Sequence, residues 1–254
     1  MSAASSANKY GREIDILTHN KKWLAELANP AKRAIHALLT QDCLLCGQTS
    51  GRRVLCEPCI NDLPLLPAML CPYCALPSPQ GELCGHCLSR PPHYDKTVAL
   101  FRYDFPLDKL VQAFKYQHRL TLASFFGHLM AEKAMDIQAD LIIPLPLHRL
   151  RLKERGFNQA LELARPVARA LQVPIDMHGC QRIRHTPAQA SLPWKERGKN
   201  IRNAFHCTKD LSGKHILLID DVMTTGSSLN ECARTLKRHG AQEVTLLVLA
   251  RALP

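Results

Sequence analysis

The sequence predicts an α/β protein in which a parallel sheet is flanked by helices and preceded by a small cysteine-rich module. Near the C-terminus, apolar runs at 216–219 and 244–250 enclose a segment with helical periodicity, which is the strand–helix–strand order of a parallel sheet. A third apolar run begins at 142. Eight cysteines gather between 43 and 87, and 254 residues suffice for such a module and one α/β core.

Composition divides the chain into three parts: a tail with short amphipathic helices (1–40), a cysteine-rich module (41–92) and the α/β domain (93–254). Residues 1–20 favour disorder, and apolar residues from Trp23 to Leu39 indicate one or two helical turns, interrupted at Pro30. Because these turns are short, we expect them to pack on the module and not on a membrane. No run is long enough to span a bilayer, and the first forty residues lack the apolar core of a signal peptide, which predicts a reduced cytoplasmic setting.

The cysteines of the module follow a repeated spacing. The pattern C-x2-C-x9-C-x2-C occurs twice, with the second set shifted by 28 residues from the first. Paired cysteines on tight knuckles are typical ligands of four-thiolate zinc sites. Residues 41–92 are therefore predicted to form a double zinc ribbon with two four-cysteine sites, whose ligands are Cys43, Cys46, Cys56, Cys59, Cys71, Cys74, Cys84 and Cys87.

The spacing leaves the pairing of the ligands open. The first C-x2-C pair shares its metal either with the second pair or, in a crossed arrangement, with the third. His86 could replace one thiolate. Disulfides are the competing interpretation, which a reducing compartment disfavours. The remaining cysteines lack a partner spacing, and we expect them to be small buried residues: Cys180, Cys207 and Cys232.

Four thiolates leave no open coordination position, so we expect both zinc ions to be structural, with metal binding coupled to folding. Residues 41–92 contain three arginines and four acidic residues, which argues against a purely electrostatic DNA clamp. Contact with single-stranded DNA through Tyr73, or with a protein partner, stays an open alternative.

Apolar patterns place further elements in the α/β domain. A strand is expected at 97–103, followed by a helix that begins at Pro106 and by a second helix through 125–130. The strand that begins at Ile142 runs into a loop, and another helix follows. Pro166 falls inside that helix and is expected to kink or restart it.

The most informative segment is 217–229. Its apolar run ends in Asp220 and Asp221, and a Thr-Thr-Gly-Ser-Ser turn then opens into a helix. Carboxylates can accept hydrogen bonds from vicinal hydroxyls, while the turn and the helix N-terminus present N–H groups to a phosphate. Ser228 and Glu231 have the spacing of a capping box. The segment thus suits a ribose 5-phosphate at the carboxyl end of a strand.

This segment resembles the phosphoribosyl pyrophosphate (PRPP) motif of the type I phosphoribosyltransferases. The resemblance implies a type I phosphoribosyltransferase-like sheet for the α/β domain. It also implies that Asp220 and Asp221 hold the ribose hydroxyls as the catalytic carboxylates. The 5-phosphate would then be bound by the residues of the turn: Thr224, Thr225, Gly226, Ser227 and Ser228.

Two runs of residues that precede this segment narrow the resemblance to one family. Pro-Leu-His at 146–148 is followed by Arg-Gly-Phe-Asn-Gln at 155–159, and a run of Arg, Thr, Gln, Arg, Asn and Ala-Phe extends from 182 to 205. Together they resemble the ComF family of competence and DNA-utilisation proteins, some of which are named GntX. The resemblance covers residues 40–252, approximately.

Positive charge is concentrated in one region. Residues 149–202 contain twelve Lys or Arg and four Asp or Glu, so +8 of the overall +11 lies there. In a phosphoribosyltransferase this region carries the pyrophosphate-binding loop and the loop that closes over it, and Arg suits bidentate phosphate contact. The resemblance assigns PRPP binding to Arg151, Lys153 and Arg155 at the pyrophosphate and to Arg184, Lys195 and Arg197 in the closing loop. Alternatively, the same residues could follow a nucleic-acid backbone.

The resemblance implies that an acceptor displaces pyrophosphate from PRPP, with Mg²⁺ neutralising the leaving group. We therefore expect a PRPP-binding phosphoribosyltransferase that acts in DNA uptake or use of external DNA, with a base, nucleotide or nucleic-acid acceptor. The alternative is a non-catalytic protein that handles single-stranded DNA under the control of PRPP or a nucleotide. Expected partners are PRPP, single-stranded DNA and other competence proteins, in the cytoplasm or peripherally at the inner face of the membrane. No segment with readable acceptor specificity is present.

Overall fold

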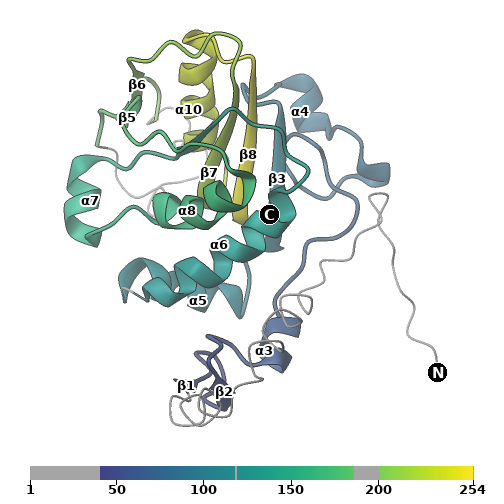
Figure 1. Cartoon of the computed structure of the whole chain (residues 1–254). Coiled ribbons are helices and arrows are strands. Elements are labelled where there is room, and N and C mark those ends of the chain that lie inside the picture. The colour runs from purple at the N-terminus through teal and green to yellow at the C-terminus, as the bar shows by residue number, and fades with distance from the viewer. Residues whose placement is uncertain (1–40, 118, 186–200, 254) are drawn as a thin grey trace. The chain divides into compact units, whose positions relative to one another are not determined.

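The computed structural model describes residues 41–117, 119–185 and 201–253 of the chain (Figure 1). The tail and helical turns predicted for residues 1–40 lie outside these ranges. Within them, no helix combines the length and the apolar character that crossing a bilayer requires. The chain divides into two compact units between Asp62 and Leu63.

The first unit contains a short hairpin and one short helix. Its described elements are the antiparallel strands β1 (Gln41–Asp42) and β2 (Thr49–Gly51) and the helix α3 (Glu57–Asn61). The turn between the strands is closed by a hydrogen bond from the N–H of Gly47 to the carbonyl of Cys43, at 2.9 Å. α3 begins after Cys56 with Pro58 in its first turn, where the missing N–H of proline costs nothing.

The second unit is built on a four-stranded sheet. Its strands are β3 (Lys96–Arg102), β4 (Leu141–Pro144), β7 (His215–Met223) and β8 (Glu243–Arg251). The order is β3-β8-β7-β4, and every neighbouring pair is parallel. In the register, Leu218 of β7 stands opposite Leu246 of β8 on one side and Ile143 of β4 on the other. The predicted parallel sheet is confirmed, and β7 occupies an interior position in it.

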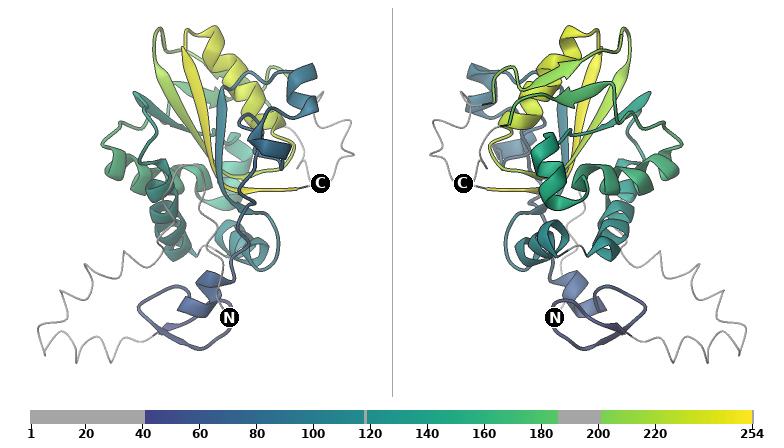
Figure 2. Two further views of the ribbon diagram at one scale, coloured as in Figure 1. Left: turned by 90° about the vertical axis from the view of Figure 1, so that its right-hand side faces the viewer. Right: turned by 90° about the vertical axis from the view of Figure 1, so that its left-hand side faces the viewer.

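Helices cover both faces of this sheet (Figures 1 and 2). The remaining elements are α4 (Gly85–Ser89), α5 (Leu107–Tyr116), α6 (Leu120–Ala134), α7 (Arg149–Arg155), α8 (Gln159–Leu171), α10 (Ser227–Arg238), the 3-10 helix η2 (Pro79–Gly81) and the antiparallel strands β5 (Cys180–Arg182) and β6 (Phe205–Cys207). On one face α8 packs on β7 and β4, α6 packs on β8 and β3, and α5 lies beside α6. α10 covers the opposite face, where Leu229, Cys232 and Leu236 share a buried cluster with Ile216 and Leu218 of β7.

The second cysteine group belongs to the second unit. Cys71, Cys74 and Cys87 are part of the same buried cluster as the inner face of α10. The N–H of Thr97 in β3 donates to the carbonyl of Pro72, which lies between two cysteines, at 2.9 Å. This cysteine knuckle is therefore attached directly to the edge of the parallel sheet.

The expectation that Pro166 restarts its helix is wrong, because α8 runs without a break through this residue, while a kink there stays a prediction. The pyrrolidine ring packs against α6 at Gly127, where a Cβ would lie only 2.6 Å from Cγ of Pro166. A proline removes one N–H donor from the helix interior. Here the loss is tolerated because the ring lies in a close contact between two packed helices.

The capping box expected at the start of α10 is also absent. The helix begins after Gly226, which has no side chain to cap it, so Ser228 and Glu231 both lie inside the helix. Glu231 has another role: Oε1 accepts a hydrogen bond from the N–H of Asn203 at 2.7 Å, and Arg234 donates to the same carboxylate. The buried carboxylate of Glu231 thus attaches α10 to the segment that precedes β6.

Candidate functional site

The predicted acidic pair lies at the carboxyl end of β7, at the edge where open parallel sheets bind ligands (Figure 1). β7 extends beyond its apolar run to Met223, so both carboxylates belong to the strand and point to opposite faces of the sheet. Asp221 is 5% exposed. Its Oδ1 accepts a hydrogen bond from the N–H of Val222 at 2.7 Å, and Oδ1 of Asp220 accepts from the N–H of Asp221 at 2.9 Å.

Lys115 of α5 supplies a charge partner that the sequence analysis did not identify. Its Nζ lies 2.8 Å from Oδ2 of Asp221, and the two side chains are 17% and 8% exposed. The signal was present in the sequence, because Leu107, Val111 and Lys115 recur every four residues on one helix face. A lysine that continues a buried stripe requires a charged partner inside the fold.

These charges change one another's ionisation. Burial lowers the pKa of Lys115, but the carboxylate of Asp221, its hydrogen bond and the charge of Asp220 outweigh burial, so the net pKa is raised. Burial, and then the charge of Asp221, raise the pKa of Asp220 to about 7, against the opposing charges of Lys115 and Arg155. Asp220 is therefore able to take up or release a proton near neutral pH.

The turn that follows the strand has the geometry of an anion-binding loop. Gly226 precedes the first turn of α10 with φ +75° and ψ 0°, a left-handed conformation that favours glycine. Oγ1 of Thr225 accepts a hydrogen bond from the N–H of Ser227 at 3.2 Å and lies 2.9 Å from Oγ of Ser227. The N-terminus of a twelve-residue helix and two hydroxyl side chains thus converge beside the acidic pair.

The Arg-Gly-Phe-Asn-Gln run connects α7 to α8. Asn158 caps α8 by accepting from the N–H of Ala160 at 3.0 Å, and its Nδ2 donates to the carbonyl of Leu145 at 3.2 Å. Nη1 of Arg155 donates to Oε1 of Gln159 at 3.0 Å. Nε of Arg155 and Nε2 of Gln159 are buried and have no hydrogen-bond partner among the described residues. Such buried donors fit a site that binds an anion.

The other predicted basic residues are placed differently. Arg151 lies 3.7 Å from Glu154 in the next turn of α7, and Lys153 is exposed. Arg184 is exposed and its Nη1 donates to the carbonyl of Arg202 at 2.8 Å. The last two basic residues of the prediction lie between 186 and 200, outside the described part of the chain: Lys195 and Arg197.

Arg182 is a further basic residue near the acidic pair, and the sequence analysis assigned it no role. Burial lowers its pKa, the charge of Asp220 raises it, and the charge of Arg151 lowers it again. The guanidinium therefore shares its electrostatic environment with the acidic pair and with α7. It also lies 5.7 Å from the centre of the Phe205 ring, across the β5–β6 hairpin. Arg182 lies in the short strand β5, and no pattern in the sequence indicated this burial.

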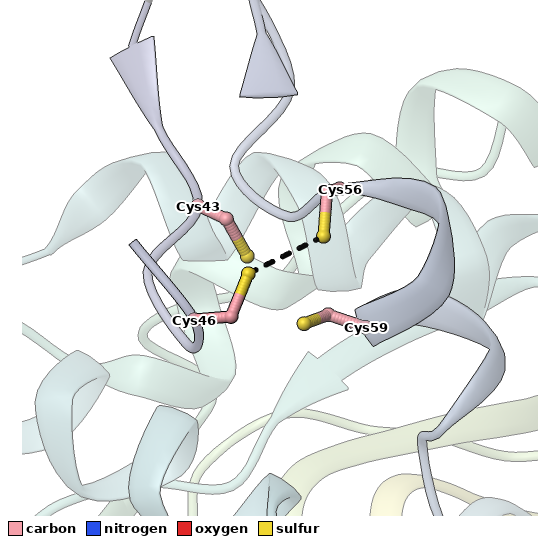
Figure 3. A group of neighbouring side chains, drawn as sticks. All are labelled: Cys43, Cys46, Cys56 and Cys59. Atoms are coloured by element: carbon pink, nitrogen blue, oxygen red, sulfur yellow. Dashed lines mark hydrogen bonds between the residues drawn. The ribbon is translucent and has the colours of Figure 1, made fainter. Parts of the chain in front are cut away.

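The first cysteine group gathers four sulfurs in the first unit (Figure 3). The ligand atoms of Cys43, Cys46, Cys56 and Cys59 lie within 4.8 Å of one another, and Sγ of Cys46 is 3.6 Å from Sγ of Cys56. Four sulfurs at about 2.3 Å from a tetrahedral zinc are about 3.8 Å apart. This group therefore fits a structural zinc ion.

The second group repeats this arrangement in the second unit. Its members are Cys71, Cys74, Cys84 and Cys87, whose sulfurs also lie within 4.8 Å of one another. Burial opposes ionisation of Cys71, but backbone N–H groups of Cys74 and Cys84 outweigh it and lower the pKa to about 7. The two groups show which cysteines share a metal: each repeat forms its own site, and the crossed arrangement is excluded. Both groups consist of four cysteines, so His86 replaces no thiolate.

The remaining three cysteines are buried, as expected: Cys180, Cys207 and Cys232. Cys180 and Cys207 face each other in the β5–β6 pair, and Sγ of Cys180 lies 3.9 Å from Sγ of Cys232 in α10. Burial raises the pKa of the Cys232 thiol well above its usual range. These thiols act as small apolar side chains between the hairpin and α10.

Comparison with known proteins agrees with this architecture. Residues 158–253 match the family described as a phosphoribosyl transferase domain, and residues 34–88 match the double zinc ribbon domain. DNA utilization protein YhgH of Escherichia coli (strain K12) is 36% identical over 192 residues, which span 72% of this chain and 85% of that protein. Competence protein F of Haemophilus influenzae is 32% identical over 209 residues, or 78% of this chain and 90% of that protein.

Among solved structures, a purine phosphoribosyltransferase from Pyrococcus horikoshii Ot3 aligns with 61% of this chain and 78% of its own, at 20% identity and a TM-score of 0.31. The assignment rests on the two sequence relatives, which are more than 30% identical and are matched over most of their length. This chain belongs to the ComF/GntX family of competence and DNA-utilisation proteins, and it carries a double zinc ribbon and a phosphoribosyltransferase domain.

Proposed function

We propose that this protein binds PRPP together with Mg²⁺ and transfers phosphoribose in the uptake or use of DNA. The supporting observation is the arrangement at the carboxyl end of β7, where the acidic pair Asp220–Asp221 is followed directly by the loop 224–228 and the N-terminus of α10. A phosphorylated ribose presents hydroxyls that suit the carboxylates and a phosphate that suits the loop and the helix N-terminus. The names of the relatives from E. coli and H. influenzae support DNA as the process in which it acts.

In the proposed complex, Asp220 and Asp221 accept hydrogen bonds from the ribose hydroxyls. The loop 224–228 binds the 5-phosphate through N–H groups and hydroxyls. Lys115 holds the carboxylate of Asp221 in place, because its ammonium lies 2.8 Å from Oδ2. Pyrophosphate is neutralised by the basic residues predicted from the sequence: Arg151, Lys153 and Arg155 at the base of the site, with Arg184, Lys195 and Arg197 closing over it.

The proposed reaction exchanges one bond at C1 of the ribose. The bond from C1 to the pyrophosphate oxygen breaks, pyrophosphate leaves with the electron pair, and C1 bonds to the acceptor nucleophile. Positive charge develops on the ribose ring, and the carboxylates beside it lower the energy of that state. Carboxylate oxygens are donors that Mg²⁺ accepts, and the ion would neutralise the leaving pyrophosphate. Asp220, whose pKa is raised to about 7, can hold a proton when no ligand is bound.

A cytoplasmic location is part of the proposal, because a reducing compartment keeps the zinc-binding thiols from forming disulfides. Peripheral contact with the inner face of the membrane and with other competence proteins is proposed with it. The zinc ions would have a structural role, since each is surrounded by four thiolates.

The proposal is tested by measuring pyrophosphate release from Mg²⁺·PRPP with bases, nucleotides or single-stranded oligonucleotides as added acceptors. Acceptor-dependent release that Asp221→Asn abolishes is the expected result. Single-stranded DNA binding that PRPP alters, without any release of pyrophosphate, would instead establish a non-catalytic, PRPP-gated DNA-handling protein. The slope of the DNA affinity against salt concentration would give the number of phosphates that the basic residues contact.

A further inference from the structure

The second metal centre and the proposed phosphate loop meet at Arg251, the last residue of β8. Its side chain is buried, with 3% exposed. Nε donates to the carbonyl of Cys74 at 2.8 Å. Nη1 donates to the carbonyls of Met223, at 3.0 Å, and of Thr224. Nη1 also donates to the carbonyl of Ala252, so all hydrogen-bond partners of this guanidinium among the described residues are backbone carbonyls.

The segment that leaves the metal centre makes two more contacts near the loop. Tyr94 is buried, and its hydroxyl would lie 3.6 Å from a Cβ placed on Gly226. The N–H of His93 donates to Oδ1 of Asn230, in the first turns of α10, at 2.7 Å. Residues that follow Cys87 closely in the chain thus lie beside the loop at Gly226 and bond the helix that it opens.

The contacts of Arg251 determine the direction of the loop's N–H groups. In a trans peptide, the carbonyl of one residue and the N–H of the next share a plane and point in opposite directions. When Arg251 holds the carbonyls of Met223 and Thr224, the N–H groups of Thr224 and Thr225 are therefore directed away from it. A loop fixed in advance avoids part of the entropy cost of ordering its backbone on binding.

We propose that the second metal centre positions the PRPP-binding loop through Arg251. Zinc bound by Cys71, Cys74, Cys84 and Cys87 fixes the carbonyl of Cys74, and the guanidinium transmits that constraint to the start of the loop. Arg251 is a positioning residue, and PRPP affinity depends on the second zinc ion. The first zinc ion, in the other compact unit, has no part in this constraint. The inference rests on the proposed function of the loop.

The first test replaces Arg251 with lysine, which keeps the charge and loses the planar fork that reaches several carbonyls. Arg238→Lys is the matched control, because Arg238 is exposed at the end of α10. Arg251→Lys is expected to weaken Mg²⁺·PRPP binding about tenfold while the zinc content stays at two per chain. Arg238→Lys is expected to leave both unchanged. Equal affinity of the two variants would overturn the proposal.

The second test uses cysteines at equivalent places in the repeat, Cys56 in the first centre and Cys84 in the second. Each serine substitution should release one zinc ion. Cys84→Ser is expected to weaken PRPP binding at least tenfold, whereas Cys56→Ser is expected to keep the affinity within about twofold. Comparable losses in both variants would contradict a specific role of the second centre.

Hydrogen exchange of the loop amides tests the positioning role of Arg251 independently of PRPP binding, because the measurement needs no ligand. In the ligand-free protein, amides of residues 224–228 should exchange faster in Arg251→Lys and Cys84→Ser than in their controls. If intact protein fails to bind Mg²⁺·PRPP, the proposed function fails, and the exchange result still decides whether zinc positions the loop. Unchanged exchange in both variants would overturn the positioning role whatever the loop binds.

Discussion

At the residue scale, the acidic pair depends on a lysine that lies about a hundred residues before it in the chain. Two adjacent carboxylates inside a fold need a cation nearby, because burial penalises charge that has no partner. Lys115 supplies that cation to Asp221 at 2.8 Å. Asp220 has a different environment, and burial with the neighbouring charge raises its pKa to about 7.

Replacing Lys115 with methionine is expected to lower the free energy of unfolding by about 3 kcal/mol, because a buried carboxylate then loses its partner. Urea denaturation followed by circular dichroism measures this change. Lys109→Met is the control on the same helix: Lys109 lies 3.5 Å from Asp108 but is 60% exposed, so its loss should cost less than about 0.5 kcal/mol. Similar small losses in both variants would show that Lys115 is not structurally required.

The raised pKa of Asp220 predicts how stability depends on pH. The folded protein binds a proton at Asp220 up to about pH 7, whereas the unfolded chain releases it near the ordinary carboxyl value. The free energy of unfolding therefore falls as pH rises between these two values, by at most about 1.4 kcal/mol per pH unit from this group. Denaturation of the protein and of Asp220→Asn from about pH 5 to 7 should show this slope only in the unsubstituted protein. Parallel curves would contradict it.

At the element scale, strands and helices followed their apolar patterns closely. The buried stripe of α10, with Leu229, Cys232, Ala233 and Leu236, was fully evident from its spacing. The length of β7 was underestimated, because Asp220 and Asp221 interrupt its apolar run while the strand continues through Val222 and Met223. α8 passes through Pro166, since packing against Gly127 outweighs the lost hydrogen bond. Local patterns cannot show such compensation between distant segments.

The left-handed backbone conformation of Gly226, at the start of α10, predicts one effect on stability and another on PRPP binding. Gly226→Ala should lower the free energy of unfolding by about 1–2 kcal/mol, the cost of a left-handed non-glycine residue. A Cβ there would also lie 2.7 Å from Cε of Met223, so the end of that side chain must shift. Gly213→Ala is the control, because it has φ +71° and open space around it. Only Gly226→Ala should also weaken PRPP binding. Equal PRPP affinities of the Gly226→Ala and Gly213→Ala variants would show that this loop does not bind the ligand.

At the scale of the whole molecule, the sequence showed which chemical groups are present but not how distant ones meet. Two zinc sites and the acidic motif were evident from spacing. Arg251 and the carbonyl of Cys74 are 177 residues apart in the chain, and no local pattern marks their contact. Division into domains at residue 92 stays a prediction, while the compact units divide after Asp62. The second cysteine repeat thus shares a unit with the sheet although it repeats the first in sequence.

The assignment of each cysteine repeat to its own metal can be tested by one double variant. Cys43→Ser combined with Cys56→Ser removes two ligands from the same site, so one zinc ion per chain should remain. In the crossed arrangement these two cysteines belong to different sites, and both ions would be lost. Metal analysis of the purified protein by emission spectrometry distinguishes the two results.

Calorimetric titration with Mg²⁺·PRPP shows whether the carboxyl end of β7 is a PRPP site. Zinc-replete protein should bind, and Asp221→Asn should bind at least tenfold more weakly, a loss of about 1.4 kcal/mol or more. Asp210→Asn, at an exposed carboxylate outside the site, should bind as the unsubstituted protein does. No binding by the intact protein, or equal binding by both variants, would contradict the claim.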